Sequence, residues 1–177
     1  MESIKNDDMA EEILDLVNED DEVIGQMPRS EVTAKKMKNK RVINAFIVND
    51  DGKLWIPRRS ANKAQSPNVL DMSVGGHVES GEDYDTCFAR ETMEETRLDV
   101  TKLPHKLLGK MTPHEHGTNA FMCVYEIRAN DVPNHNPEDF SEYYWLTPQE
   151  VLDRLASGDM GKHDLPIIIR HYYCQVL

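Results

Sequence analysis

Three glutamates that lie close together in the sequence, Glu91, Glu94 and Glu95, could bind a metal ion if they share one face of a helix. A helix turns by about 100° per residue, so their carboxylates would project within a sector of about 100°. Like charges at this spacing repel one another by about 0.2–0.5 kcal/mol per pair, a cost that a bound cation would offset. Because every ligand is an oxygen, the trio predicts Mg²⁺ or Mn²⁺. The alternative is an ordinary solvated Glu-rich helix, and the flanking residues decide between the two.

The residues around this glutamate trio follow a fixed spacing. Gly76 is followed after five residues by Glu82, and Glu82 is followed after seven residues by the run from Arg90 to Leu98. This stretch resembles the Nudix box, GX₅EX₇REUXEEXGU, in which U is a bulky aliphatic residue. Six fixed positions match, so the chance of a random occurrence is on the order of 10⁻⁷ per starting position. The resemblance implies an α/β (α+β) fold, the Nudix αβα sandwich with a mixed sheet, in which the box forms a catalytic loop–helix–loop.

The same resemblance implies a role for each matching residue. The glutamate trio would bind the metal and catalyse the reaction, and the Gly76 carbonyl would add a further metal ligand. Glu82 and Arg90 would form the ion pair that shapes the loop, with Arg90 also counted among the catalytic residues. Two positions depart from the pattern: Thr92 replaces an aliphatic residue and Arg97 replaces a glycine. Neither departure removes a metal ligand, although Arg97 would have to adopt a left-handed conformation to end the helix as glycine does.

A second resemblance lies upstream of the box. The run from Arg58 to His77, RRSANKAQSPNVLDMSVGGH, is similar to the corresponding stretch of isopentenyl-diphosphate isomerase, itself a Nudix-fold enzyme. This similarity implies that Arg59 and Lys63 bind a substrate diphosphate, a role that suits a guanidinium fork beside an ammonium group. His77 would lie near the metals and contact the substrate. The alternative for Arg59 and Lys63 is a basic patch that only offsets the acidic surface.

The catalytic residues of the isomerase have no match in this sequence. Its catalytic cysteine falls at Gly75, and its Glu-Asn-Glu motif aligns with Thr118-Asn119-Ala120. One of its metal-binding histidines is kept as His77, while another is Lys40. Transfer of a proton to carbon needs an acid and a base at these positions, so the sequence favours hydrolysis over isomerisation.

A further candidate for catalysis is the segment His114-Glu115-His116. Two histidines two residues apart could ligate a metal if they lay on one side of a strand, but a solvent-exposed loop without metal is the preferred interpretation. Catalytic bases of Nudix enzymes often come from a loop outside the helix. Glu115 is therefore one candidate base, and Glu95 is the other.

The predicted elements alternate irregularly between strand and helix, which favours a sandwich over a doubly wound parallel sheet. A hairpin and a short helix are expected first, over residues 11–38. Strands are then expected over 41–48, 53–58, 68–74, 106–111, 120–128 and 142–146. Helices are expected over 30–37 and 82–98, from a capping box at Thr147 to about Ala156, and from about Leu165 onward.

Composition narrows the function classes. A net charge of −12 disfavours a broad nucleic-acid surface, but it allows a small anionic ligand whose charge is met by metal ions. No apolar run is long enough for a membrane span, and no secretory signal is evident. Three widely spaced cysteines predict reduced thiols in a cytoplasmic protein. The length of 177 residues suits one core, so we expect a β-rich lead-in over 1–38 that packs on a Nudix domain over 39–177, as a monomer or a homodimer.

These observations predict a Mg²⁺-dependent (or Mn²⁺-dependent) hydrolase that cleaves a phosphoanhydride bond in a small diphosphate, such as a nucleoside diphosphate derivative. Two alternatives stay open. One is an enzyme like isopentenyl-diphosphate isomerase, and the other is a non-catalytic nucleotide-binding Nudix module.

Overall fold

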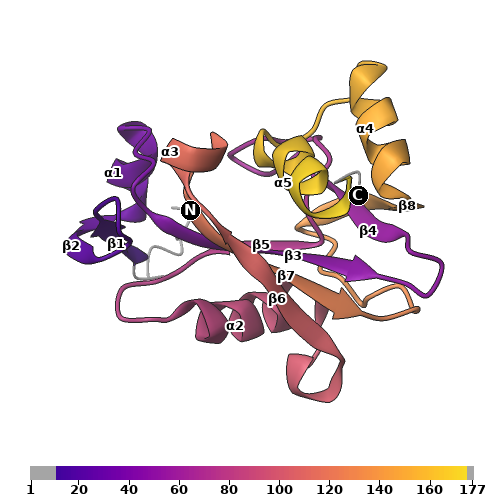
Figure 1. Ribbon diagram of the computed structural model, residues 1–177, viewed down its shortest axis with the longest axis horizontal. Helices are drawn as coiled ribbons and strands as arrows, with labels where there is room; N and C mark the ends of the chain where they lie inside the picture. The colour runs from indigo at the N-terminus through magenta and orange to yellow at the C-terminus, as the bar shows by residue number, and fades with distance from the viewer. Residues whose placement is uncertain (1–10, 175–177) are drawn as a thin grey trace, which may run out of the picture.

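The central element of the computed structural model, which describes residues 11–174, is a six-stranded mixed sheet (Figure 1). Its strands run in the order β6-β7-β3-β4-β8, with β5 paired to β3. Only β3 and β7 are parallel, and the other pairs are antiparallel. The strands are β3 (Arg41–Val48), β4 (Leu54–Arg59), β5 (Val74–His77), β6 (His105–Met111), β7 (Phe121–Arg128) and β8 (Phe140–Leu146).

Helices cover both faces of this sheet because β3 alternates its apolar side chains between two cores. Ile43 packs toward α2 (Tyr84–Thr96), where Phe88 is buried. Phe46 packs toward α4 (Pro148–Ala156) and α5 (Asp164–Tyr173), where Ile168 is buried. In Figure 1, α2 lies below the sheet and α4 and α5 lie above it. The predicted αβα sandwich with a mixed sheet is therefore confirmed.

The N-terminal lead-in is a small β-hairpin followed by a short helix. Its elements are β1 (Ile13–Val17), β2 (Val23–Pro28) and α1 (Arg29–Ala34), packed around a separate cluster that contains Leu14 and Val32. Asp21 ties this unit to the main domain, because its carboxylate accepts hydrogen bonds from Arg41 at 2.7 Å and Tyr84 at 3.0 Å. Residues 1–10 of the predicted unit lie outside the described residues, and the division at residue 38 stays a prediction.

Two predicted elements are wrong. The strand expected over 68–74 begins only at Val74 and continues through the glycine pair to His77. Residues 66–73 do not form a strand. Ser66 and Asn68 take positive φ angles of 48° and 59°, which lie outside the β region. The segment around Glu115 is a short helix, α3 (Pro113–His116), where a loop was expected. Its start is capped by the Thr112 hydroxyl, which accepts from the Glu115 backbone N–H.

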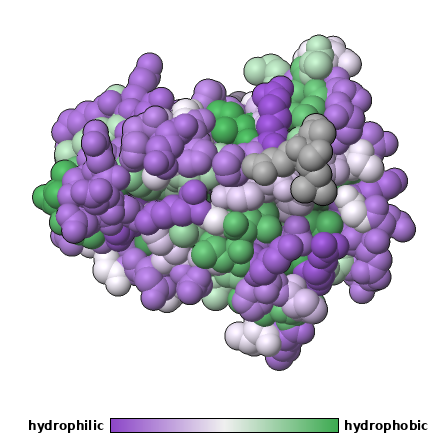
Figure 2. All heavy atoms as spheres, in the orientation of Figure 1, coloured by the Kyte–Doolittle hydropathy of each residue, from purple (hydrophilic) through white to green (hydrophobic). Residues whose placement is uncertain are grey.

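The capping box predicted at Thr147 is present. The Glu150 backbone donates to the Thr147 hydroxyl at 3.2 Å, and the Thr147 backbone donates to the Glu150 carboxylate at 2.7 Å. Figure 2 shows hydrophilic side chains over much of one face of the molecule, with apolar patches between them. Among residues 11–174, no helix combines the length and the apolar character that a membrane span requires.

Candidate active site

The box folds as a loop, the helix α2 and a second loop. The Asp83 side chain caps the start of α2 by accepting from the Thr86 backbone N–H at 2.7 Å. The helix ends at Thr96 because Arg97 adopts a left-handed conformation, with φ 59° and ψ 19°. Its backbone N–H donates to the Met93 carbonyl at 3.0 Å, as a C-terminal cap usually does. The chain thus makes the expected turn without the usual glycine.

The glycine pair of β5 brings strand backbone directly against the acidic face of α2. A Cβ added at Gly76 would lie only 2.0 Å from the Glu91 carboxyl carbon. The Gly75 backbone N–H donates to Glu95 Oε2 at 3.1 Å. No side chain larger than hydrogen fits at residue 76 while Glu91 keeps its place. Glycine is therefore what allows the β5 backbone to lie this close to the Glu91 side chain.

Arg90 holds the loop and the helix together. Its guanidinium donates two hydrogen bonds to the Glu82 carboxylate, both at 2.9 Å, which is the ion pair that the sequence predicted. It also donates to Glu91 Oε1 at 2.9 Å and lies 3.6 Å from Glu94 Oε2. Arg90 therefore offsets the negative charge of Glu91 and Glu94.

The members of the trio differ in exposure. Burial raises the pKa of Glu91 to about 7 and that of Glu95 to about 8, whereas the Glu94 side chain is 59% exposed. Two carboxyl groups held out of water favour either protons or a cation. The carboxylate oxygens of the glutamate trio, together with the Gly76 backbone that lies against them, suit a hard divalent ion. Within the described residues, no three acidic, histidine or cysteine side chains converge closely enough to hold a metal, and Glu91 is engaged by Arg90.

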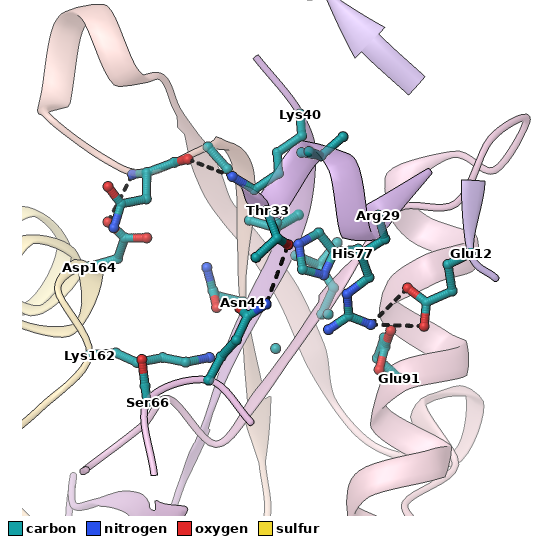
Figure 3. Close-up of a pocket in the computed structure, with 18 of the residues that line it drawn as sticks. Glu12, Arg29, Thr33, Lys40, Asn44, Ser66, His77, Glu91, Lys162 and Asp164 are labelled. Carbon is teal, nitrogen blue, oxygen red and sulfur yellow. Dashed lines mark hydrogen bonds and ion pairs between the residues drawn. The ribbon is translucent and has the colours of Figure 1, made fainter. Parts of the chain in front are cut away.

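The glutamate trio lines a cleft of about 1410 Å³ (Figure 3). This cleft is enclosed by α1, β5, α2, the loop after β4 and the loop before α5. The predicted diphosphate ligands Arg59 and Lys63 line this cleft, as His77 does. Both basic residues are ion-paired, Arg59 with Asp71 at 2.9 Å and Lys63 with Asp139. The structure therefore brings the predicted metal ligands and the predicted substrate ligands to one cavity.

Glu115 is not part of this arrangement. Its side chain is 64% exposed, its carboxylate accepts from the Thr112 hydroxyl at 3.1 Å, and it does not line the cleft. His116 accepts from the Thr112 backbone N–H at 3.1 Å. Of the two candidate bases, only Glu95 lies at the cleft.

The cleft also has a basic wall that the sequence did not assign to the site. Lys36, Lys38 and Lys40 line it from the segment after α1, and Lys162 lines it from the loop before α5. A lysine run in a chain of net charge −12 was an available signal for the first three. Lys162 gave no such signal, because only the fold places it beside Arg59 and Asp71.

Comparison with known proteins agrees with this geometry. The NUDIX domain model matches residues 38–165. An uncharacterized Nudix hydrolase of Nostoc sp. is 49% identical over 162 residues, which is 92% of this chain and 96% of that protein. A crystal structure of a Deinococcus radiodurans protein superposes with a TM-score of 0.89 at 46% identity, covering 92% of this chain and 99% of that one.

The likeness to the isomerase is present but more distant. An isopentenyl-diphosphate Delta-isomerase of Paenarthrobacter aurescens is 27% identical over 150 residues, which is 82% of each protein. Gly75, which the sequence analysis aligned with the isomerase cysteine, lies on β5. The match of the domain model and the near-half identity of the Nostoc relative show that this chain belongs to the Nudix hydrolase family, a family of pyrophosphohydrolase enzymes.

Proposed function

We propose that the protein is a Mg²⁺-dependent hydrolase that cleaves a phosphoanhydride bond in a small-molecule diphosphate, such as a nucleoside diphosphate derivative. One observation carries the proposal: the box glutamates line the same cleft as Arg59 and Lys63. Acidic residues at one place and basic residues at another suit a ligand that carries both a metal ion and free phosphate oxygens.

Each residue then has a distinct task. Glu91, Glu94, Glu95 and the Gly76 carbonyl would hold Mg²⁺, or Mn²⁺ in its place. When bound, the metal supplies charge neutralisation on the phosphoryl oxygens and lowers the pKa of a water molecule. Arg59 and Lys63 would bind the diphosphate, for which their present partners Asp71 and Asp139 are competitors.

Arg90 and Glu95 complete the proposal. Arg90 has Glu82 as a second partner, so the loop would stay anchored if Glu91 bound a metal. Glu95 is the candidate base because, of Glu95 and Glu115, only Glu95 lines the cleft. A cytoplasmic location, where nucleotides and Mg²⁺ occur together, is part of the proposal.

The test is a substrate panel followed by phosphorus NMR. The purified protein with Mg²⁺ is offered nucleoside di- and triphosphates, nucleotide sugars, dinucleotides and isopentenyl diphosphate. New monophosphate or phosphate signals support hydrolysis. A shifted double bond without phosphate release would point to the isomerase, and binding without turnover, even with Mn²⁺, would point to a non-catalytic module.

A matched pair of variants tests the metal site itself. Glu94→Gln should abolish turnover while the thermal unfolding midpoint stays close to wild type, because the side chain is exposed. Glu31→Gln is the control: this residue is similarly exposed at 54%, is also paired with a cation, and does not line the cleft. Turnover that survives Glu94→Gln would remove the helix from the proposal. Sedimentation of the same samples distinguishes a monomer from a homodimer.

A further inference from the structure

One part of the cleft wall gathers side chains from three distant segments. Lys40 precedes β3, His77 ends β5 and Lys162 lies in the loop before α5, and all three line the cleft (Figure 3). Three nitrogen-bearing side chains from separate segments thus line one cavity.

His77 is available to a ligand. Its backbone carbonyl accepts hydrogen bonds from Cys87 and from Arg90 at 3.1 Å. Within residues 11–174, neither nitrogen of its ring has a hydrogen-bond partner. An imidazole carries at least one N–H donor in either protonation state, so the ring can donate to an acceptor group in the cleft.

Lys40 carries a positive charge without an ion-pair partner. Its ammonium group donates to the Met37 carbonyl at 2.6 Å and to the Asn119 carbonyl at 3.2 Å, which leaves one of its three protons free. Among the described residues, no carboxylate lies within ion-pair distance of it. The nearby Asp164 is engaged by the Asn119 backbone N–H at 3.0 Å.

Lys162 adds to the positive surplus. It lies 3.0 Å from Asp71 Oδ2, the same oxygen that Arg59 contacts at 2.9 Å. Two cations therefore share one negative charge. Arg29, on the lead-in side of the cleft, is neutralised by the two oxygens of Glu12, both at 2.8 Å. Among the described residues, the one carboxylate within ion-pair distance of Lys162 is thus shared with Arg59.

A metal ion does not explain the arrangement. The ammonium group of Lys40 would repel a divalent cation. In the described part of the chain, His77 belongs to no group of three metal-ligating side chains. The same positions therefore suit an anion.

We propose that His77, Lys40 and Lys162 form a phosphate subsite that binds a phosphoryl group of the substrate without a metal ion. The subsite rests on the proposed function for its role in catalysis, since it would hold a phosphoryl group of the diphosphate. Its binding chemistry stands independently, because an ammonium pair and one imidazole N–H recognise inorganic phosphate as well as a phosphate ester.

The experiment is isothermal titration of inorganic phosphate into the full-length protein in the presence of EDTA. Wild type should bind phosphate with measurable heat, and Lys40→Met should weaken the affinity by about tenfold or more, since a hydrogen bond to a charged group is lost. Lys40→Arg should restore most of it. Lys162→Met should weaken binding similarly and still fold, because Asp71 keeps Arg59 as its partner.

Lys35→Met is the matched control. It removes the same charge from the same basic run, but Lys35 pairs with Glu31 and does not line the cleft. Equal losses in Lys35→Met and Lys40→Met would show a net-charge effect and overturn the subsite, as would an absence of phosphate binding by wild type.

Steady-state kinetics separate this subsite from the proposed function. With Mg²⁺ and a hydrolysed diphosphate, Lys40→Met should raise KM while kcat changes little. Unchanged KM and unchanged phosphate affinity would overturn the subsite while hydrolysis stands. Phosphate binding that depends on Lys40 in a protein without any hydrolase activity would sink the proposed function and leave the subsite intact.

Discussion

Replacement of Gly76 by alanine should damage the metal site much more than the fold. The added Cβ would lie 2.0 Å from the Glu91 carboxyl carbon and 2.1 Å from its Oε1. Carbon atoms in contact prefer a separation of about 3.5 Å, so the carboxylate must move by about 1.5 Å. The carboxylate is the end of a flexible side chain, so strain in the fold should stay near 1–2 kcal/mol.

The catalytic cost should be larger. A displacement of about 1 Å in a positioned group can reduce a rate by about 100-fold, so we expect kcat/KM of Gly76→Ala to fall by about 100-fold. Affinity for Mg²⁺ should fall with it. The assay combines phosphate release with a calorimetric Mg²⁺ titration, and a urea unfolding curve reports the change in stability.

The neighbouring glycine offers a matched control. A Cβ at Gly75 would meet Asn44 Oδ1 at 2.9 Å and no carboxylate of α2. Gly75→Ala should therefore keep most of its Mg²⁺ affinity, since the backbone N–H that binds Glu95 is unchanged. A folded Gly76→Ala protein with wild-type Mg²⁺ affinity and turnover would refute the assigned role of Glu91, and so would an equal loss in Gly75→Ala.

Three further outcomes follow from the departures of α2 and from its buried acids. Thr92→Val should stabilise the protein by about 1 kcal/mol in urea unfolding, because the Thr92 hydroxyl is buried without a hydrogen-bond partner among the described residues; a loss of stability would show that the hydroxyl is satisfied. Arg97→Gly should also add about 1 kcal/mol, since φ is 59° at this residue, and an unchanged urea midpoint would contradict the strain. In the metal-free protein, burial raises the pKa of Glu91 to about 7 and of Glu95 to about 8, so the folded state holds these protons more tightly than the unfolded chain. Stability should then fall as the pH rises from about 4.5 to about 8, while Mg²⁺ affinity rises over the upper part of this range; thermal unfolding that moves the other way with pH would contradict the burial of the two acids.

Features that depend on neighbouring residues were predictable from the sequence. The placement of Glu91, Glu94 and Glu95 on α2 follows from helical spacing, and the capping box at Thr147 follows from residue types three apart. The long apolar runs of residues in β3 and β7 also predicted strands correctly. Both strands are almost fully buried, so most of the residues in them are apolar.

Features that depend on distant partners were not predictable. The glycine pair was expected to end a strand, but Gly76 pairs with Ile43, so the strand extends through it. The basic wall needs Lys40 and Lys162, which are separated by most of the chain, to line one cleft. Glu115 was placed near the chemistry by analogy with loops of the family, and the start of α3 at Pro113 directs it elsewhere.

The parallel pairing of β3 with β7 has a consequence for the order of folding. Arg41 pairs with Phe121, so the middle of the sheet joins residues 80 positions apart. Contacts of such long range slow the folding search. On the ribosome, α2 emerges before the strand that completes the sheet beside it. A nascent chain that stops before Phe121, the start of β7, would therefore leave Phe88 without its stacking partner Tyr125 and expose the apolar face of α2.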